Sequence, residues 1–258
     1  MTETIGIIGK GVLGTSIFNF FELKINVLVY DKYKNIGNFD NILNTDILFL
    51  CLPSLFKEEI KEYDIDEIKE TCNLLRENKY KGIIILKSTV LPGTTEMLNK
   101  EYGLNIIHNP EFLSEKTATD DFKNQKHIVL GGEELDKCIN FFKRYFPDIE
   151  YSYLTSKESE LMKIAVNNFY STKIMFFNEL FILSQNINTS YEKVKEAMLK
   201  NKWINPMHTK VPGNNNKLGF GGMCFPKDTS AYYNYLKKNS EYYEIAKATV
   251  EQNKTIRK

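Results

Sequence analysis

Residues 5–14 read Ile5-Gly6-Ile7-Ile8-Gly9-Lys10-Gly11-Val12-Leu13-Gly14. The stretch Ile5–Ile8 is typical of a short buried strand, and Gly9–Gly14 form a G-x-G-x-x-G pattern that leads into a helix-like run. In such a strand–turn–helix unit, glycines let a pyrophosphate approach the helix N-terminus, where free N–H groups and the helix dipole favour anions. The stretch therefore predicts a dinucleotide site near the start of an α/β domain.

A second strand-like segment, Val27–Tyr30, ends in Asp31, which lies 20 residues after Gly11. An acid at this place can accept hydrogen bonds from both ribose hydroxyls, and it repels a 2′-phosphate. The pattern therefore favours NAD over NADP as the cofactor. The alternative is a structural glycine turn with a solvated acid at the end of a strand.

Composition excludes several classes of protein. The chain has 258 residues, 42% of them hydrophobic, and its 34 basic and 33 acidic residues leave a net charge of +1. Near-neutral charge gives no electrostatic case for nucleic acid or a membrane surface. The sequence contains no apolar run long enough for a membrane helix and no signal peptide. Its four scattered cysteines predict reduced thiols in the cytoplasm, without a metal site.

Further strands are predicted at Ile47–Leu52, Gly82–Lys87, Leu104–His108 and His127–Gly131. They alternate with helical segments, which indicates a Rossmann-type parallel sheet. Only 15 residues separate Asp31 from Asp46. An additional crossover and strand cannot fit there, so we expect the sheet to be trimmed on that side.

Short segments with polar side chains follow these strands: Pro53-Ser54, Ser88-Thr89, and Glu111 with Glu115. Hydroxyls at the carboxyl ends of parallel strands face the crevice in which α/β sheets bind ligands, although they can also cap the next helix. Glu111 and Glu115 are four residues apart, so a helical turn would place them on one face. Such a pair can do acid–base chemistry if one pKa is raised, and a solvated face is the alternative.

From about Thr155 onward the pattern is helical only, so we predict domains at 1–154 and 155–258. Capping boxes are predicted at Thr155 with Glu158 and at Thr189 with Glu192. The first opens a long helix, about 157–185, on which Lys163 and Asn167 share a face. Together these two side chains can bind an oxyanion, or they can be a solvated surface pair.

A long loop is predicted at 203–225, and it holds the glycines of the stretch Leu-Gly-Phe-Gly-Gly-Met-Cys-Phe-Pro-Lys-Asp-Thr at 218–229. Glycines that precede Cys224 allow close approach of a ligand to the backbone. A neighbouring lysine and a helix N-terminus both favour the nucleophilic thiolate. The alternative is a glycine turn with a buried cysteine and with Asp228 as the N-cap of the next helix.

Five collinear motifs resemble the UDP-glucose/GDP-mannose dehydrogenase family. They are GKGVLG, KSTVLPGTT, NPEFLSE with DFKNQKHIVLGG, ESELMKIAVNNFYSTKIMFFNEL and VPGNNNKLGFGGMCFPKD, and they span nearly the whole chain. The resemblance implies a four-electron oxidation with two NAD⁺, which converts the 6-hydroxymethyl group of a nucleotide sugar into a carboxylate. We expect UDP-glucose to be converted to UDP-glucuronate.

The resemblance also implies roles for individual residues. Cys224 is the nucleophile that captures the aldehyde, and Lys163 with Asn167 stabilises the oxyanion. Thr89, Glu115 and Asp228 position water and handle protons, and Glu111 is a further acid of the site. The expected cofactor-binding residues are Gly9, Gly11, Val12, Leu13, Gly14, Asp31, Pro53, Ser54, Thr89 and Glu115. The expected substrate-binding residues are Phe112, Leu113, Ser114, Lys163, Asn167, Phe220 and Gly221.

The resemblance leads us to expect a C-terminal nucleotide-binding domain, which these 258 residues do not include. We expect a homodimer through the long helix, and a separate subunit could supply the missing domain. The open alternatives are a catalytically impaired NAD-binding remnant, a partner of a full-length dehydrogenase, and a dehydrogenase for another nucleotide sugar or a small hydroxy acid. Hydroxy-acid dehydrogenases of this plan use a helix lysine without a cysteine, so Cys224 discriminates against them.

Overall fold

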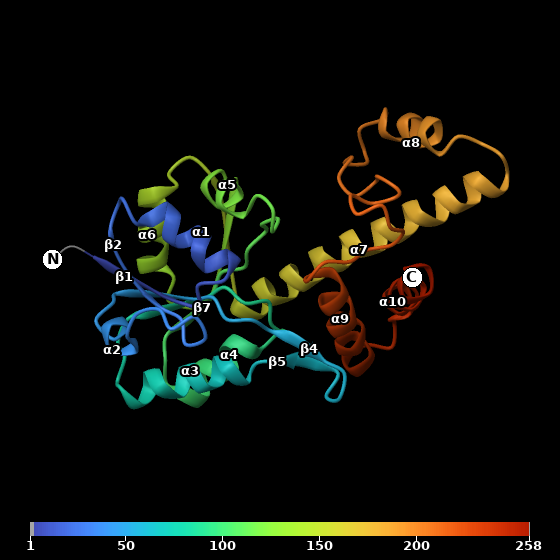
Figure 1. The fold of residues 1–258 in the computed structure, drawn as a ribbon. Helices are drawn as coiled ribbons and strands as arrows, with labels where there is room; N and C mark the ends of the chain where they lie inside the picture. Colours follow the sequence, from blue (N-terminus) through green and yellow to red (C-terminus); the bar gives the residue numbers. More distant parts are fainter. Residues whose placement is uncertain (1–2, 258) are drawn as a thin grey trace. The chain divides into compact units, whose positions relative to one another are not determined.

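The computed structural model describes residues 3–257, which form two compact units (Figure 1). The first unit comprises the chain up to Leu55 together with Tyr63–Lys163, and the second comprises Phe56–Glu62 and the chain from Ile164 onward. The units divide one long helix between Lys163 and Ile164. Our functional border between residues 154 and 155 remains a prediction.

A seven-stranded sheet forms the centre of the first unit, in the order β2-β1-β3-β6-β7-β8-β9. Its strands are β1 (Thr4–Ile8), β2 (Asn26–Tyr30), β3 (Ile47–Leu50), β6 (Ile83–Leu86), β7 (Ile106–His108), β8 (His127–Gly131) and β9 (Glu150–Leu154). The first five strands of this order are mutually parallel, whereas β8 runs antiparallel to β7 and pairs in parallel with β9. β2 is the edge strand beside β1, so the trimmed Rossmann-type sheet is confirmed.

Both faces of this sheet are covered by helices, as Figure 1 shows. One face carries α1 (Val12–Phe21), α5 (Ala118–Lys123) and α6 (Asp136–Tyr145), and the other carries α2 (Phe39–Ile42), α3 (Asp66–Glu77) and α4 (Thr94–Tyr102). All residues of β3 and β6 are buried, as expected for apolar strands covered on both sides. Cys72 and Cys138 lie in the two apolar cores, where they pack as small apolar side chains.

The strand register brings the carboxyl ends of four strands to one edge. Ile8 pairs with Leu50, Leu50 with Leu86, and Leu86 with His108. The residues that follow these strands, Gly9, Cys51, Lys87 and Asn109, therefore lie along the edge where α/β sheets bind ligands. A separate two-stranded sheet of β4 (Leu55–Lys57) and β5 (Glu62–Asp64) was not predicted.

The second unit is helical. α7 (Ser156–Asn186) enters it from the first unit, and α8 (Tyr191–Leu199), α9 (Phe225–Asn239) and α10 (Glu244–Ile256) follow. Phe177, Tyr191 and Val211 form a small apolar core. Within residues 3–257, no helix is long and apolar enough to cross a lipid bilayer.

Helix starts confirm one predicted capping box and correct another. The Thr155 hydroxyl accepts the Glu158 N–H at 3.2 Å, and Glu158 accepts the Thr155 N–H at 2.8 Å. The predicted box of Thr189 with Glu192 is wrong because Ser190 is the N-cap of α8 and accepts the Lys193 N–H.

The alternative interpretation of the cysteine motif, with Asp228 as the N-cap of the next helix, is wrong. The helix begins at Phe225, so Cys224 is its N-cap and Asp228 lies in its first turn. Pro226 fits the first turn because N–H groups there have no partner within the helix.

Candidate functional site

The glycine turn exposes the N-terminus of α1. Gly9 has φ +91°, and a Cβ on it would lie 2.5 Å from the Cys51 carbonyl oxygen. A Cβ on Gly14 would lie 1.9 Å from the Gly9 carbonyl oxygen, whereas a Cβ on Gly11 would meet nothing within 4 Å. Gly11 is the N-cap of α1 and supplies no side-chain cap. Two glycines thus serve packing, while the space over Gly11 can admit a ligand.

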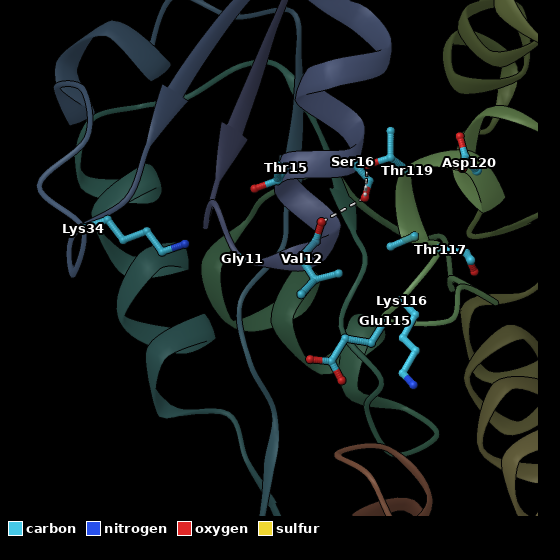
Figure 2. A pocket seen from close by; sticks show the side chains of 11 residues that line it. Gly11, Val12, Thr15, Ser16, Lys34, Glu115, Lys116, Thr117, Thr119 and Asp120 are labelled. Carbon is cyan, nitrogen blue, oxygen red and sulfur yellow. Dashed lines mark hydrogen bonds between the residues drawn. The ribbon is translucent and has the colours of Figure 1, made fainter. Parts of the chain in front are cut away.

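An open pocket of about 390 Å³ lies at this helix end (Figure 2). Its walls are the first turns of α1, the segment 115–120 and Lys34. The pocket brings together three predicted cofactor residues, Gly11, Val12 and Glu115. Free N–H groups at a helix N-terminus make such a pocket suitable for a pyrophosphate.

Asp31 joins the glycine turn to the loop that follows β2. One carboxylate oxygen accepts the Lys10 N–H at 2.7 Å, and the other accepts the Tyr33 and Lys34 N–H groups at 3.1 and 2.9 Å. Burial raises the pKa of Asp31, but these N–H groups outweigh it and hold the pKa below its ordinary value. A carboxylate offers about four acceptor positions, so one remains for a ribose hydroxyl.

Hydroxyls at the strand ends hold the neighbouring loops together. Ser54 donates to the Thr89 carbonyl oxygen at 2.6 Å, and Ser88 donates to the Leu52 carbonyl oxygen at 2.6 Å. The structure thereby brings Ser54 and Thr89 together, while Pro53 beside them is exposed. Ser88 therefore fixes the backbone of Leu52, at the edge of the sheet where ligands are expected to bind.

A buried polar network at the same edge was missed by the sequence analysis. Lys87 donates to the Asn109 side-chain oxygen at 2.7 Å, and the Asn109 amide donates to the Val129 carbonyl oxygen at 2.7 Å. Burial lowers the pKa of Lys87 to about 8 and that of His108 to about 3. The His108 ring lies 2.8 Å from the Ser159 hydroxyl. These contacts fasten the ends of β6 and β7 to each other, to the middle of β8 and to the first turn of α7.

Glu111 and Lys163 form an ion pair within the first unit. Lys163, 4% exposed, lies 3.2 Å from a Glu111 carboxylate oxygen, and it also donates to the Glu111 carbonyl oxygen. The other carboxylate oxygen accepts the Leu113 N–H at 2.6 Å. The Lys163 ammonium lies 5.1 Å from the centre of the Phe112 ring. Three predicted site residues, Glu111, Phe112 and Lys163, therefore meet.

The predicted helical face of Glu111 and Glu115 is wrong. Residues 109–114 have no helical structure, and the Glu111 carboxylate accepts the Leu113 N–H of its own loop. Glu115 lines the pocket at α1 instead. Ser114 donates its N–H to Asp121 at 2.9 Å, which holds this loop to α5.

In the second unit, three predicted catalytic residues lie together. The Asn167 amide donates to a buried Asp228 carboxylate oxygen at 2.6 Å, and Lys227 contacts the other oxygen at 2.6 Å. The Asp228 N–H donates to the Cys224 carbonyl oxygen at 2.9 Å. Asn167 is thereby oriented toward the first turn of the helix that begins after Cys224.

Cys224 differs from the other three cysteines because its side chain is exposed. Burial raises the pKa of Cys51, Cys72 and Cys138 to about 12, which disfavours their thiolates. Of the predicted substrate-binding residues near Cys224, Phe220 has a buried side chain and Gly221 packs against the Arg257 guanidinium. Within the described residues 3–257, no group of His, Cys, Asp and Glu side chains could hold a metal ion.

Two models of one protein family match this chain. The NAD-binding domain of the UDP-glucose/GDP-mannose dehydrogenase family matches residues 24–149, and the central domain of that family matches residues 157–255. Together they cover most of the chain.

Curated relatives and solved structures agree with these matches. UDP-glucose 6-dehydrogenase of Rickettsia felis is 30% identical over 233 residues, which cover 86% of this chain and 50% of the relative. The corresponding protein of Rickettsia prowazekii is 29% identical over 258 residues, covering 94% of this chain and 58% of that protein. The chain thus spans about half the length of the curated relatives it matches.

The solved structures share the fold. A UDP-glucose dehydrogenase from Pyrobaculum islandicum has a TM-score of 0.86 at 24% identity, and the match covers 99% of this chain and 68% of that one. A 3-hydroxyisobutyrate dehydrogenase from Mycobacterium tuberculosis has a TM-score of 0.77 at 14% identity, covering 99% of this chain and 94% of that one.

Proposed function

The chain belongs to the UDP-glucose/GDP-mannose dehydrogenase family, and we propose that it oxidises a nucleotide sugar with NAD as the cofactor. UDP-glucose is the proposed substrate and UDP-glucuronate the product. Residues 1–154 are proposed to bind NAD and residues 155–258 to carry the cysteine. A reducing compartment such as the cytoplasm is proposed, because the four cysteines are scattered along the sequence without paired spacing.

One observation carries the proposal. Cys224 places an exposed thiol at the N-terminus of α9, and the Asn167–Asp228 hydrogen bond lies in the first turn of that helix. Structural cysteines are usually buried, and a thiol at a helix N-terminus is favoured as the thiolate nucleophile. A nucleophile with an oriented amide and a buried carboxylate fits acyl chemistry better than a packing role.

The residues of the first unit fit the cofactor. The space over Gly11 admits the pyrophosphate, and Asp31 retains an acceptor position for a ribose hydroxyl. NAD⁺ supplies the hydride acceptor for both oxidations. Ser54 fixes the backbone of Thr89, and Glu115 borders the pocket. These are the residues that we propose to hold the cofactor, together with Gly9, Val12, Leu13, Gly14 and Pro53.

The proposed chemistry proceeds in three stages. The alcohol oxygen first loses a proton and the carbon loses a hydride to NAD⁺, which gives an aldehyde. The Cys224 sulfur then adds to the aldehyde carbon as its proton passes to the aldehyde oxygen, which gives a thiohemiacetal. Loss of that hydroxyl proton and of a second hydride from carbon to the second NAD⁺ gives a thioester. Water finally attacks the thioester carbon and the C–S bond breaks; one water proton returns to the Cys224 sulfur and the other is released with the carboxylate. Covalent capture prevents the aldehyde from escaping.

The remaining site residues support these stages. Lys163 and Asn167 are the proposed donors to the oxyanion, and Glu111 holds Lys163 in place. Asp228, Glu115 and Thr89 are proposed to position water and handle protons. Phe112, Leu113, Ser114, Phe220 and Gly221 are proposed to contact the substrate.

We also propose a homodimer through α7. Phe169, Phe176 and Leu183 recur every seventh residue on this helix and are exposed, at 65%, 53% and 53%. A stripe of large apolar side chains on one helix face favours pairing with a second copy.

A separate nucleotide-binding subunit would add contacts to the nucleotide of the substrate, and adding it should then lower KM and raise turnover.

The test is NADH formation by the purified chain with a panel of nucleotide sugars and free hydroxy acids. We expect UDP-glucose to yield two NADH per sugar, and Cys224→Ser to block formation of uronate while the fold is retained. Met223→Ala is the matched control, because Met223 is exposed and adjacent in sequence. Uronate formation by Cys224→Ser at the parent rate would refute the covalent mechanism. Activity with hydroxy acids alone would refute the proposal that the substrate is a nucleotide sugar.

A further inference from the structure

Side chains from two helices fasten the glycine segment 218–222, which precedes Cys224. Asn178 on α7 accepts the Gly219 N–H at 2.9 Å. Asn253 on α10 accepts the Phe220 N–H at 2.8 Å and donates to the Phe220 carbonyl oxygen at 3.1 Å. One buried amide thus satisfies both backbone groups of Phe220, as a neighbouring β-strand would.

Arg257, at the end of α10, holds the same segment. Its guanidinium donates to the Leu218 carbonyl oxygen at 3.2 Å and to the Gly219 carbonyl oxygen at 3.4 Å. A Cβ on Gly219 would lie 2.3 Å from the Asn253 side-chain oxygen, and a Cβ on Gly221 would lie 2.1 Å from an Arg257 nitrogen. These two glycines therefore make room for side chains of α10.

The fastened segment lies shortly before Cys224 in the chain. Phe220 is four residues before Cys224, and Gly222 between them has φ +79°. On the other side, the Asp228 N–H binds the Cys224 carbonyl oxygen, and the Asp228 carboxylate binds Asn167. The backbone of Cys224 is therefore held between the α10 contacts before it and the first turn of α9 after it.

We infer that Asn253 and Arg257 are positioning residues that keep the Cys224 thiol at the N-terminus of α9. This inference rests on the proposed role of Cys224 as the nucleophile. If these contacts are lost, the segment before Cys224 can move, and the thiol leaves the helix N-terminus that stabilises its thiolate. Reactivity of Cys224 then falls although its exposure is retained.

The experiment measures alkylation of each cysteine by iodoacetamide as a function of pH, with peptide mass spectrometry as the readout. For Asn253→Ala and Arg257→Lys we expect the rate at Cys224 near pH 7 to fall about threefold or more, and the midpoint of its pH profile to rise. Rates at buried Cys72 and Cys138 should stay at parent values. Lys254→Ala is the matched control, because Lys254 is exposed on the same helix.

Two outcomes would overturn the inference. One is an unchanged Cys224 profile in both variants. The other is an equal rise in reactivity of all four cysteines, since general unfolding would mean that the contacts are only structural. If Asn253→Ala fails to fold, Arg257→Lys decides by the same readout. The assay needs neither substrate nor NAD, so a shifted profile in a chain that oxidises no sugar would separate this inference from the proposed function.

Discussion

Glu160 connects α7 to the start of α4 within the first unit, and its removal provides a quantitative test of the fold. Its side chain is fully buried. One carboxylate oxygen accepts the Thr95 N–H at 2.7 Å and the Thr95 hydroxyl at 2.6 Å, and the other accepts the Gly93 N–H at 2.6 Å. The carboxylate thus binds donors at the N-terminus of α4, and Lys163 of the proposed site follows Glu160 by three residues.

Glu160→Ala should destabilise the first unit substantially. The variant takes the acceptor away from two backbone N–H groups, while the Thr95 hydroxyl can rotate toward another acceptor. A buried donor that loses its partner costs about 1–3 kcal/mol, so two such donors give a loss of about 2–6 kcal/mol. We use about 3 kcal/mol, because the Gly93 donor is only partly buried. In a unit of this size the melting midpoint should fall by about 6–12 °C.

The assay is thermal and urea unfolding followed by circular dichroism, with Glu96→Ala as the control. Glu96 lies on the first turn of α4, next to the Thr95 that binds Glu160, but Glu96 is exposed. Its contact with Lys157 at 3.1 Å is a surface ion pair worth about 0–1 kcal/mol. If the midpoints of Glu160→Ala and Glu96→Ala agree within error, the buried carboxylate does not hold α7 to α4 as argued.

The effect of Glu160 should also depend on pH in a defined direction. Burial raises its pKa above the ordinary 4.5, although the three donors oppose the shift. A carboxyl group whose pKa rises on folding contributes most stability below its unfolded pKa, and this contribution declines as pH rises through the folded value. The stability difference between the parent and Glu160→Ala should therefore be larger at pH 4 than at pH 8, and the opposite trend would refute the assignment.

Three further predictions concern the cofactor and the dimer. Gly11→Ala should keep the parent melting midpoint but raise the Kd for NAD⁺ about tenfold in calorimetry, whereas Gly14→Ala should disrupt the turn, because its Cβ would lie 1.9 Å from a carbonyl oxygen. The parent should bind NAD⁺ more tightly than NADP⁺, and Asp31→Asn should reduce the difference between the two affinities. Equal affinities in the parent would rule out discrimination against the 2′-phosphate by Asp31. Phe176→Glu should give a folded monomer by sedimentation, and an unchanged dimer would exclude the α7 stripe.

Much of the sheet could be predicted because its signals are local. β3 and β6 are uninterrupted apolar runs, and the glycine turn between β1 and α1 has a defined spacing. The two strands β4 and β5 were missed because each has three residues with a mixture of charged and apolar side chains. The second capping box was misplaced by one residue because Thr189 and Ser190 are both good caps, and only tertiary structure decides between them.

Buried polar residues were harder to predict than apolar ones. Lys87 follows four apolar residues. A lysine that is exposed to solvent at the end of a strand has the same pattern, so the sequence does not reveal that Lys87 is buried. Its burial depends on Asn109, 22 residues later, which satisfies the ammonium and in turn donates to Val129. Glu160 is a comparable case, because its partners lie 65 and 67 residues away. Such contacts join separate elements and leave no periodic pattern in the sequence.

The glycines before Cys224 show that a recognised motif can have a second physical cause that its own residues do not reveal. From the sequence, Gly219 and Gly221 indicate space for a ligand. In the structure, Asn253 and Arg257 occupy the positions that side chains on these glycines would need. The cysteine motif and the end of α10 therefore constrain each other across more than 30 residues of chain. A substitution at Asn253 would leave every residue of the motif intact, and on these contacts it should still alter the chemistry of Cys224.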